Sequence, residues 1–441
     1  MTTGVSLHPL TRGLLWVLGL HSVLGLLLVL TGHDTVLQHV AGFLLARGHH
    51  DSWEPMRQAL AYVRSAGAEP LYEVVFFQRG VIFTYPTTSL LFLEGVGAVT
   101  GHPLAADGPL NVLSWIAVAT TIGASTLLLR ESVRVHLPEL WRGAAYERRL
   151  VWILGAALTL LFYPLVKAFT LGQIQTLITA LVACAMLAWV RGREGWAGAC
   201  VALACLVKPQ IGLLVVWALL RRRWRFAWAW AAVVVPIGLW SVARYGVANQ
   251  FDYVRQLSFI TAHSWSYAPN QSVAGILNRA LFIGQNLEWD THYVSYNAVV
   301  YVGTVVSSGL FVLTGLFVGL RTARVDDHDL APLALATLCF TMASPVAWEH
   351  HYGVLAPALA WLAPLAAGAV RRGSAGTWLA VAYLAVANLL HPLDVFAATR
   401  ANVLQNNLFA GALLLLFLLG QARRGSRVAT QTFEPERTVS T

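Results

Sequence analysis

The chain has 441 residues, of which 57% are hydrophobic and 12% are charged, whereas an ordinary soluble domain has about 25% charged residues. This composition excludes a water-soluble protein. The formal net charge of +9 does not indicate a nucleic-acid-binding protein either, because the arginines stand in short clusters between apolar runs. Those runs recur from Leu14 to Leu419. The sequence therefore predicts one polytopic membrane domain over residues 1–424, with membrane lipid as a partner and no nucleic acid.

Thirteen apolar runs are candidates for membrane-spanning helices. A helix needs about 20 apolar residues to cross the hydrocarbon core, where lipid offers the backbone no hydrogen-bond partners. We therefore expect an all-α, polytopic integral membrane protein with 12 or 13 transmembrane helices. The runs occupy residues 13–31, 82–99, 109–129, 150–168, 174–190, 195–207, 210–220, 226–243, 297–320, 329–343, 352–370, 376–390 and 406–420.

The basic clusters set the expected orientation, because cytoplasmic loops of membrane proteins carry an excess of arginine and lysine. They are Arg130 to Arg149, Arg191/Arg193, Arg221 to Arg225, Arg321/Arg324, Arg371/Arg372 and Arg423/Arg424. With these clusters inside the cell, the extracytoplasmic surface of the cytoplasmic membrane is formed by residues 32–80, 170–174, 245–296 and 344–352. The polar tail over residues 425–441 is expected to be disordered in the cytoplasm.

Two places do not fit a simple series of crossings. Residues 32–80 are expected outside the cell and the first basic cluster inside, which requires an odd number of crossings between them. Two apolar runs lie there, so run 82–99 or run 109–129 must be re-entrant or only partly inserted. Runs 195–207 and 210–220 are short, and Pro209 separates them because proline cannot continue a helix. We expect this pair to form a helical hairpin that dips into the membrane from the cytoplasmic side.

The first outer segment, residues 32–80, is expected to contain an amphipathic helix that lies on the membrane surface. The helix begins near Pro55. Its apolar residues recur at helical spacing. They are Met56, Ala59, Leu60 and Val63.

Acidic side chains precede this helix at the expected lipid–water boundary. Asp51 follows two histidines and is suited to take a proton as a general base. The alternative is that Asp51 or Ser52 only caps the helix. Asp34 and Glu54 are rival acids, although Asp34 closely follows the first apolar run and is expected to end that helix.

The chain has only two lysines, Lys167 and Lys208, and both lie at the ends of apolar runs. Charged groups inside a membrane are costly and usually functional. The alternative is that each side chain reaches the interface along its own apolar stem. We expect at least one of them to bind a phosphate group. Gln173 follows Lys167 on the outer side, and Tyr85 stands before another apolar run, where aromatic residues often serve only as membrane anchors.

The large outer loop, residues 245–296, gathers amide and aromatic side chains. Asn270 and Gln271 follow a tryptophan and a tyrosine, and Arg279 comes next. Amides supply donors and acceptors for hydroxyl groups, and aromatic rings stack on the C–H faces of sugars. This mixture is typical of a sugar-binding surface.

The densest polar cluster beside hydrocarbon joins two apolar runs. It consists of Trp348, Glu349, His350 and His351. We expect a phosphate or acceptor contact here rather than a metal, because adjacent helical side chains point about 100° apart and do not easily bind one ion. The four cysteines stand inside apolar runs without metal-ligand spacing. No metal site and no cofactor are therefore predicted, although a divalent metal stays open.

In their order and spacing, these motifs resemble glycosyltransferase family 87, a family of GT-C-type membrane glycosyltransferases once described only as a domain of unknown function. The resemblance covers residues 50–370. The motifs that carry it are Pro70-Leu71-Tyr72, Tyr85-Pro86, Leu171-Gly172-Gln173, Lys208-Pro209, Asn270-Gln271-Ser272, Ser344-Pro345 and Trp348-Glu349-His350-His351-Tyr352. Thr87 and Gln175 depart from the family pattern, which usually has proline and asparagine at these places.

The resemblance implies a GT-C-like helical fold whose outer loops carry short interfacial helices. It also implies transfer of a sugar, with inversion, from a polyprenyl-phosphate donor to a hydroxyl of an envelope glycolipid or glycan. The general base is carried over to Asp51, with Asp34 and Glu54 as alternatives. The residues expected to bind the donor phosphate are Lys208, Lys167, Arg279, His350 and His351. The residues expected to contact the sugar or acceptor are Gln173, Tyr85, Asn270, Gln271, Trp348 and Glu349.

Several functional alternatives stay open at this point. Mannose is the expected sugar, and arabinofuranose is the alternative. A lipid-linked sugar flippase or transporter would bind the same groups without forming a product. A structural subunit of an envelope complex would need none of these side chains for its function.

Overall fold

The structure, a computed structural model, describes residues 7–65, 69–102, 104–281, 284, 286–290, 293–318, 320, 328–368 and 374–431. Over these residues the regular structure is helical, and one isolated antiparallel bridge joins Asn270 to Trp348. The expected all-α polytopic class is confirmed. The clusters Arg321/Arg324 and Arg371/Arg372 lie outside the described residues.

Among the described residues, four helices are long and apolar enough to cross a membrane by themselves: α1 (Pro9–Leu30), α5 (Asp107–His136), α12 (Trp224–Tyr245) and α15 (Ala298–Phe317). A fifth segment consists of α7 (Ala145–Leu160) and α8 (Tyr163–Leu171), which meet at a bend of 49°. Proline at the start of α8 explains the break, because it has no N–H to continue α7.

The other apolar runs form shorter helices, so the number of 12 or 13 crossings stays a prediction. These helices are α4 (Thr88–Thr100), α9 (Gln175–Val190), α10 (Glu194–Cys205), α11 (Leu213–Leu220), α16 (Ala331–Met342), α17 (Ala356–Gly368), α18 (Ala375–Val386) and α19 (Asn407–Gln431). α19 continues into the expected tail, and residues 432–441 lie outside the described part of the chain.

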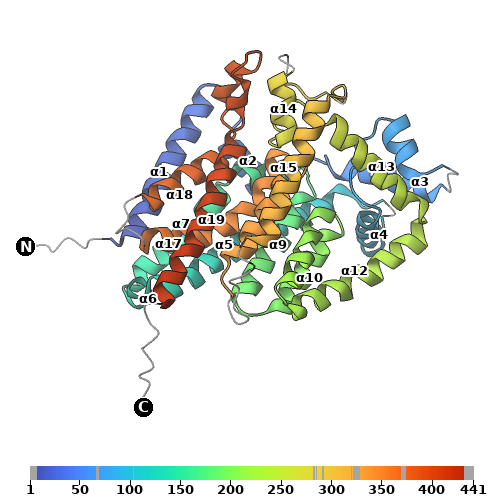
Figure 1. Cartoon of the computed structure of the whole chain (residues 1–441). Helices are drawn as coiled ribbons and strands as arrows, with labels where there is room; N and C mark the ends of the chain where they lie inside the picture. The colour runs from blue at the N-terminus through green and yellow to red at the C-terminus, as the bar shows by residue number, and fades with distance from the viewer. Residues whose placement is uncertain are drawn as a thin grey trace, which may run out of the picture.

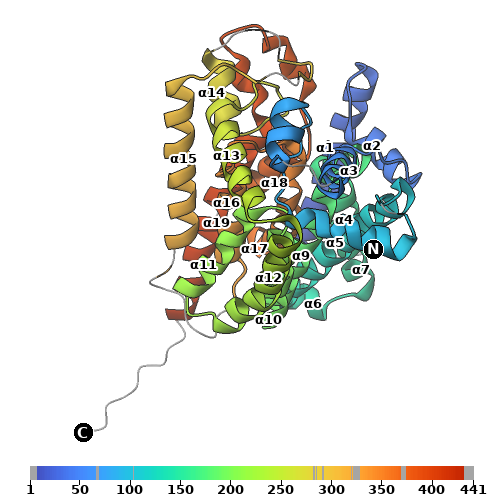
Figure 2. The ribbon, with the colours of Figure 1, turned by 90° about the vertical axis from the view of Figure 1, so that its right-hand side faces the viewer.

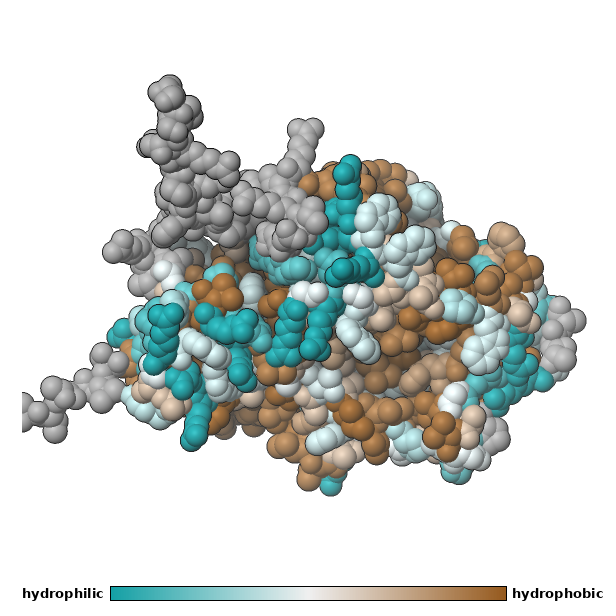
Figure 3. All heavy atoms as spheres, turned by 90° about the horizontal axis from the view of Figure 1, so that it is seen from below, coloured by the Kyte–Doolittle hydropathy of each residue, from teal (hydrophilic) through white to brown (hydrophobic). Residues whose placement is uncertain are grey.

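The two ends of the helix bundle differ in character. α6 (Pro138–Arg142) and the beginning of α10 lie at the lower end in Figure 1, and α14 (Val273–Leu281) lies at the upper end. At the lower end Arg134 and Arg191 pair with Glu131 at 3.3 and 3.1 Å. Figure 3 views this end from below and shows hydrophilic side chains gathered beside a hydrophobic region. The lower end therefore carries the basic residues that are expected inside the cell.

α4, in the first of the two conflicting runs, differs in direction from the long helix α15. It is seen end-on in Figure 1 and lies sideways in Figure 2, so it runs across α15 rather than along it. Its 13 residues span only about 20 Å at 1.5 Å per residue. Of the two conflicting runs, α5 is long enough to cross a membrane and α4 is a shorter apolar helix, so a re-entrant or only partly inserted run stays a prediction.

The short helices α10 and α11 are separated as Pro209 predicts. Lys208 takes an extended conformation, with φ −124° and ψ 92°, which is the conformation that a following proline favours. The chain then turns through the 3₁₀ helix η2 (Pro209–Gly212) into α11. Both α10 and α11 pack against α12.

The amphipathic helix exists, but its apolar face is covered by protein rather than by lipid. α3 (Trp53–Arg64) packs against α4 and against the π-helix η1 (Glu73–Gln78). Its residues Met56, Ala59 and Leu60 are each 0% exposed. The expected position of this face on the membrane surface is therefore wrong, because the neighbouring elements supply the apolar contact instead.

Candidate active site

The segment before α3 lies against the turn after α8. Three backbone amides of residues 49–52 donate to carbonyl oxygens of residues 170–172 at 3.0 to 3.2 Å. Gly172 has a φ of +70°, and a Cβ at this position would lie 2.0 Å from the His49 carbonyl oxygen. Only glycine fits this conformation and this close approach. Gly172 therefore lets the two segments meet and brings Gln173 beside Asp51.

Gln173 links Asp51 to two hydroxyl groups. Its amide nitrogen donates to the Asp51 carboxylate. Its amide oxygen accepts from the hydroxyls of Ser52, at 2.7 Å, and Tyr85, at 3.3 Å. Ser52 Oγ also accepts from the backbone amide of Ile174 at 3.0 Å. The Ser52 side chain does not cap α3, as one interpretation of the sequence required, because it binds the turn after α8.

The surroundings of Asp51 make its carboxyl group more basic than that of an ordinary aspartate. The side chain has accessible surface, yet nearby protein displaces much of the bulk water and raises the pKa of the Asp51 carboxyl. The hydrogen bond from Gln173 and the charge of His50 act in the opposite direction and are weaker. Asp51 is thus accessible and has a raised pKa, as a general base requires.

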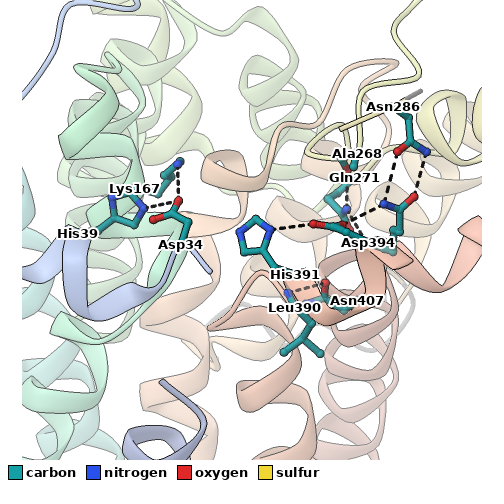
Figure 4. A network of polar contacts seen from close by, with 11 residues as sticks. Asp34, His39, Lys167, Ala268, Gln271, Asn286, Leu390, His391, Asp394 and Asn407 are labelled. Atoms are coloured by element: carbon teal, nitrogen blue, oxygen red, sulfur yellow. Dashed lines mark hydrogen bonds and ion pairs between the residues drawn. The ribbon is translucent and has the colours of Figure 1, made fainter. Parts of the chain in front are cut away.

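Asp34 lies in a second network, at Lys167 of α8. Its carboxylate binds Lys167 Nζ at 2.9 Å and His39 Nε2 at 3.0 Å, as Figure 4 shows. Burial raises the pKa of Asp34, but His39 and Lys167 together lower it far below the usual value. Asp34 does not end α1, which stops at Leu30. Lys167 is held in this ion pair rather than reaching freely to the interface.

Lys208 and two histidines come together from distant parts of the chain. His350 and His351 lie in the 3₁₀ helix η4 (Glu349–Leu355). Burial, and then the charge of Lys208, lowers the pKa of both histidines. Both ring nitrogens of His350, which is 4% exposed, lack a hydrogen-bond partner in the described part of the chain. The group therefore combines a lysine amine with imidazoles that have N–H groups to donate.

Asn270 and Gln271 are fully buried and hold the large loop together. The Asn270 side chain donates to the Trp265 carbonyl at 3.0 Å and accepts from the Ala347 amide at 3.2 Å. The Gln271 side chain donates to the Gln405 carbonyl at 3.0 Å. These amides are occupied by the protein itself, so their expected contact with sugar finds no support in this arrangement.

Arg279 has a similar structural role. Its guanidinium is 0% exposed and donates to the carbonyls of Ser266, Tyr267 and Asn270 at 3.0 to 3.2 Å. It also binds the side chain of Asn406. Arg279 thereby ties α14 to the loop, and its expected contact with a phosphate finds no support either.

Trp348 and Glu349 lie where this loop meets η4. The Trp348 ring is 5.4 Å from Trp289 and 5.7 Å from Trp265, measured between ring centroids. Glu349 is 4% exposed, and the Tyr163 hydroxyl is the partner of its otherwise unpaired carboxyl oxygen among the described residues. Burial raises the pKa of the Glu349 carboxyl, and the charge of Lys167 opposes this rise. Glu349 therefore faces the network around Asp34.

Three residues of these networks had not been singled out in the sequence: His39, His391 and Asp394. His391 Nδ1 lies 2.9 Å from Asp394 Oδ2, and both belong to the 3₁₀ helix η6 (His391–Phe396). Figure 4 shows His391 beside Asp34. The only signal for His391 and Asp394 in the sequence was a histidine and an acid three residues apart. No local pattern connects this pair with Asp34 in the N-terminal part of the chain.

The structure therefore brings many of the expected residues into three groups, of which the last two are neighbours because the charges of Lys208 and Lys167 both act on His350. Asp51 lies with Gln173 and Tyr85, Lys208 lies with the two histidines, and Lys167 lies with Asp34. In the part of the chain that the structure describes, no three His, Cys, Asp or Glu side chains are arranged to hold a metal ion.

Together the fold and these groups define a class of protein: a polytopic helical membrane protein with acid, cation and imidazole groups gathered at buried helix junctions. The sequence profile of glycosyltransferase family 87 matches residues 83–348. The chain belongs to this family and is a glycosyltransferase, which confirms the resemblance inferred from its motifs.

Individual proteins show similarity over most of the chain. The polyprenol-phosphate-mannose-dependent alpha-(1-2)-phosphatidylinositol pentamannoside mannosyltransferase of Mycolicibacterium smegmatis is 27% identical over 330 residues, which are 74% of this chain and 73% of the relative. The crystal structure of ArnT from Cupriavidus metallidurans bound to undecaprenyl phosphate aligns with 16% identity and a TM-score of 0.37, over 91% of this chain and 81% of that chain. Its apo state aligns over the same shares with 17% identity and a TM-score of 0.34.

Proposed function

We propose that the protein transfers one mannosyl residue, with inversion, from polyprenyl-phosphate mannose to a hydroxyl of an envelope glycolipid or glycan. The reaction takes place on the extracytoplasmic face of the cytoplasmic membrane. The observation that carries the proposal is the match of residues 83–348 to a glycosyltransferase family. The name of the mycolicibacterial relative supports the choice of donor and sugar.

The proposed general base is Asp51. Its raised pKa gives it the stronger affinity for the acceptor proton, and its carboxylate is accessible beside Gln173 and Tyr85. Asp34 is the competing candidate, because it lies among ionisable side chains from several elements, but its ion pair with Lys167 lowers its basicity. Glu54 is exposed and bound to Gln58 at 3.0 Å on the α3 surface, so it lacks comparable surroundings.

The proposed ligands of the donor phosphate are Lys208, His350 and His351. Lys208 supplies the positive charge, and the uncharged imidazoles supply N–H donors at the charge that develops on the leaving phosphate. Lys167 is already paired with Asp34 at 2.9 Å, and Arg279 is bound to loop carbonyls, so both are weaker candidates. No metal and no other cofactor is part of the proposal.

The test is transfer of radiolabelled mannose from polyprenyl-phosphate mannose to envelope lipid by purified protein in nanodiscs. Asp51→Asn should lower kcat by about 10²–10⁴-fold, which is the usual contribution of a general base. Glu54→Gln should retain activity and serves as the control for a lost carboxylate in the same segment.

Two results would contradict parts of this proposal. Loss of transfer in Asp34→Asn with activity retained in Asp51→Asn would move the base to Asp34. Absence of a labelled product with mannose and arabinofuranose donors, together with movement of the intact donor across liposome membranes, would replace the transferase by a transporter.

A further inference from the structure

A second polar cluster lies beside the proposed phosphate ligands, because Glu349 precedes His350 in η4 and the charge of Lys167 acts on His350. We call it the upper polar cluster, and it consists of Asp34, Lys167, Glu349, His391 and Asp394. The members come from the segment after α1, from α8, from η4 and from η6. The charges of Asp34 and Glu349 both act on His391, so these groups face one another, as Figure 4 shows for Asp34 and His391.

The polar groups of this cluster differ in their hydrogen-bond partners. Glu349 is 4% exposed and Tyr163 is 1% exposed. In the described part of the chain, no hydrogen-bond partner is found for His391 Nε2, while Glu349 Oε2 and the Tyr163 hydroxyl have no partner other than each other. Buried polar atoms are nearly always hydrogen-bonded. The unpaired nitrogen of His391, beside two groups that interact only with each other, therefore points to a ligand that supplies further hydrogen bonds.

The charges of the cluster favour a neutral ligand with hydroxyl groups. Three carboxyl groups outnumber the two cationic side chains, and one of these, Lys167, is paired with Asp34 at 2.9 Å. A phosphate would meet the carboxylates at a cost, whereas hydroxyl groups donate to carboxylates and accept from histidine. The phenol of Tyr267, whose pKa burial and nearby acids raise to about 12, adds another O–H group beside them.

The contribution of η6 lies outside the part of the chain that the family profile matches, which ends at residue 348. Asp394 Oδ1 accepts from Gln405 Nε2 at 3.0 Å, and Gln405 accepts from Asn286 at 3.0 Å. These bonds fix η6 to the large loop. The segment 387–406 is therefore held against the large loop and reaches the cluster with His391 and Asp394.

We propose that the upper polar cluster binds hydroxyl groups of the acceptor, and that segment 387–406 determines which acceptor is used. The inference rests on the proposed transferase function, in which donor and acceptor occupy separate places. His391 and Asp394 are then specificity residues that contact the acceptor, and they do not take part in donor cleavage.

The test separates acceptor from donor by measuring KM for each. The acceptor probe is octyl α-mannopyranoside, and the donor is radiolabelled polyprenyl-phosphate mannose. His391→Gln and Asp394→Asn should each raise the acceptor KM by about tenfold or more, as expected when a bound hydroxyl loses its partner, with the donor KM unchanged. Val395→Ala is the matched control, because Val395 lies on the same helix and is 74% exposed. An unchanged acceptor KM, or a rise in donor KM instead, would overturn the proposal.

A binding measurement keeps this test independent of transfer. Equilibrium dialysis of radiolabelled octyl α-mannopyranoside against protein in nanodiscs should show binding to wild type that weakens about tenfold in Asp394→Asn. This result, with no transfer by wild type, would support the subsite while the transferase proposal fails. The acceptor subsite would be overturned if wild type did not bind the probe, or if Asp394→Asn bound it as tightly as wild type. Either result would count even if mannose is transferred to lipid.

Discussion

The basicity of Asp51 depends on a neighbouring amide. Burial raises the pKa of the Asp51 carboxyl, and the hydrogen bond from Gln173 lowers it. Gln173→Leu removes this bond at similar side-chain volume, so the pKa should rise further. Because the base acts as a carboxylate, transfer should then be lost at a higher pH as the solution is made more acidic. The pH dependence of kcat/KM for wild type and variant measures this shift.

Gln58→Leu is the matched control for this substitution. Gln58 lies on the exposed surface of α3 and binds Glu54 at 3.0 Å. The acidic side of the kcat/KM profile of Gln58→Leu should coincide with that of wild type. An acid limb of Gln173→Leu that stays in place, or that moves to lower pH, would show that Asp51 is not the base.

Single residues could be found in the sequence more readily than their partners. Lys167 stood out because lysine is rare in this chain, yet its partner Asp34 lies 133 positions away. Asn270 and Gln271 have the chemistry of sugar ligands, but their amides are bonded to backbone groups. Side-chain type defines what a residue is able to bind, and only the folded neighbourhood decides what it does bind.

At the scale of elements, the contact between α10 and α12 depends on one glycine. A Cβ at Gly198 would lie 2.2 Å from the Phe226 carbonyl oxygen, whereas at Gly195 the nearest atom is Ala229 Cβ at 3.9 Å. Gly198→Ala should lower the free energy of unfolding by about 2 kcal/mol, because the helices must move apart. Gly195→Ala on the same helix should leave stability unchanged or slightly higher.

Thermal unfolding of both variants in detergent measures this difference. Gly195→Ala controls for the added methyl group and for the helix propensity of alanine. If both variants unfold at the wild-type temperature, the distance between α10 and α12 is not limited at Gly198.

The elements also show where sequence periodicity stops being informative. The spacing of Met56, Ala59 and Leu60 predicted the helix α3 and its apolar face, and both exist. The further expectation that lipid covers this face was wrong, because lipid and protein are both apolar and the spacing of the residues does not distinguish them. Likewise, run 82–99 is hydrophobic enough for a span, and only the direction of α4 shows that it does not run along α15.

At the scale of the whole molecule, the proposed orientation predicts which residues are reached from outside the cell. Val395 is 74% exposed on η6, and Arg142 is exposed at the lower end on α6. With a membrane-impermeant maleimide, Val395→Cys should be labelled in intact cells. Arg142→Cys should be labelled only after the membrane is opened, because basic clusters face the cytoplasm.

The protein without these substitutions is the control, since its four cysteines lie in apolar helices. Labelling of Arg142→Cys in intact cells, with Val395→Cys protected, would reverse the orientation and place the site on the cytoplasmic face.

The sequence by itself determined the all-α membrane class, the positions of the apolar runs and the family. These features depend on composition and on short motifs, and lipid imposes helices wherever such runs must satisfy their own backbone hydrogen bonds. The tertiary structure decided how the polar side chains are grouped: Asp51 with Gln173, Asp34 with Lys167, and His391 with Asp394 near Asp34. Such groups form between residues far apart in the chain, and their energies depend on distance and burial, which no local pattern encodes.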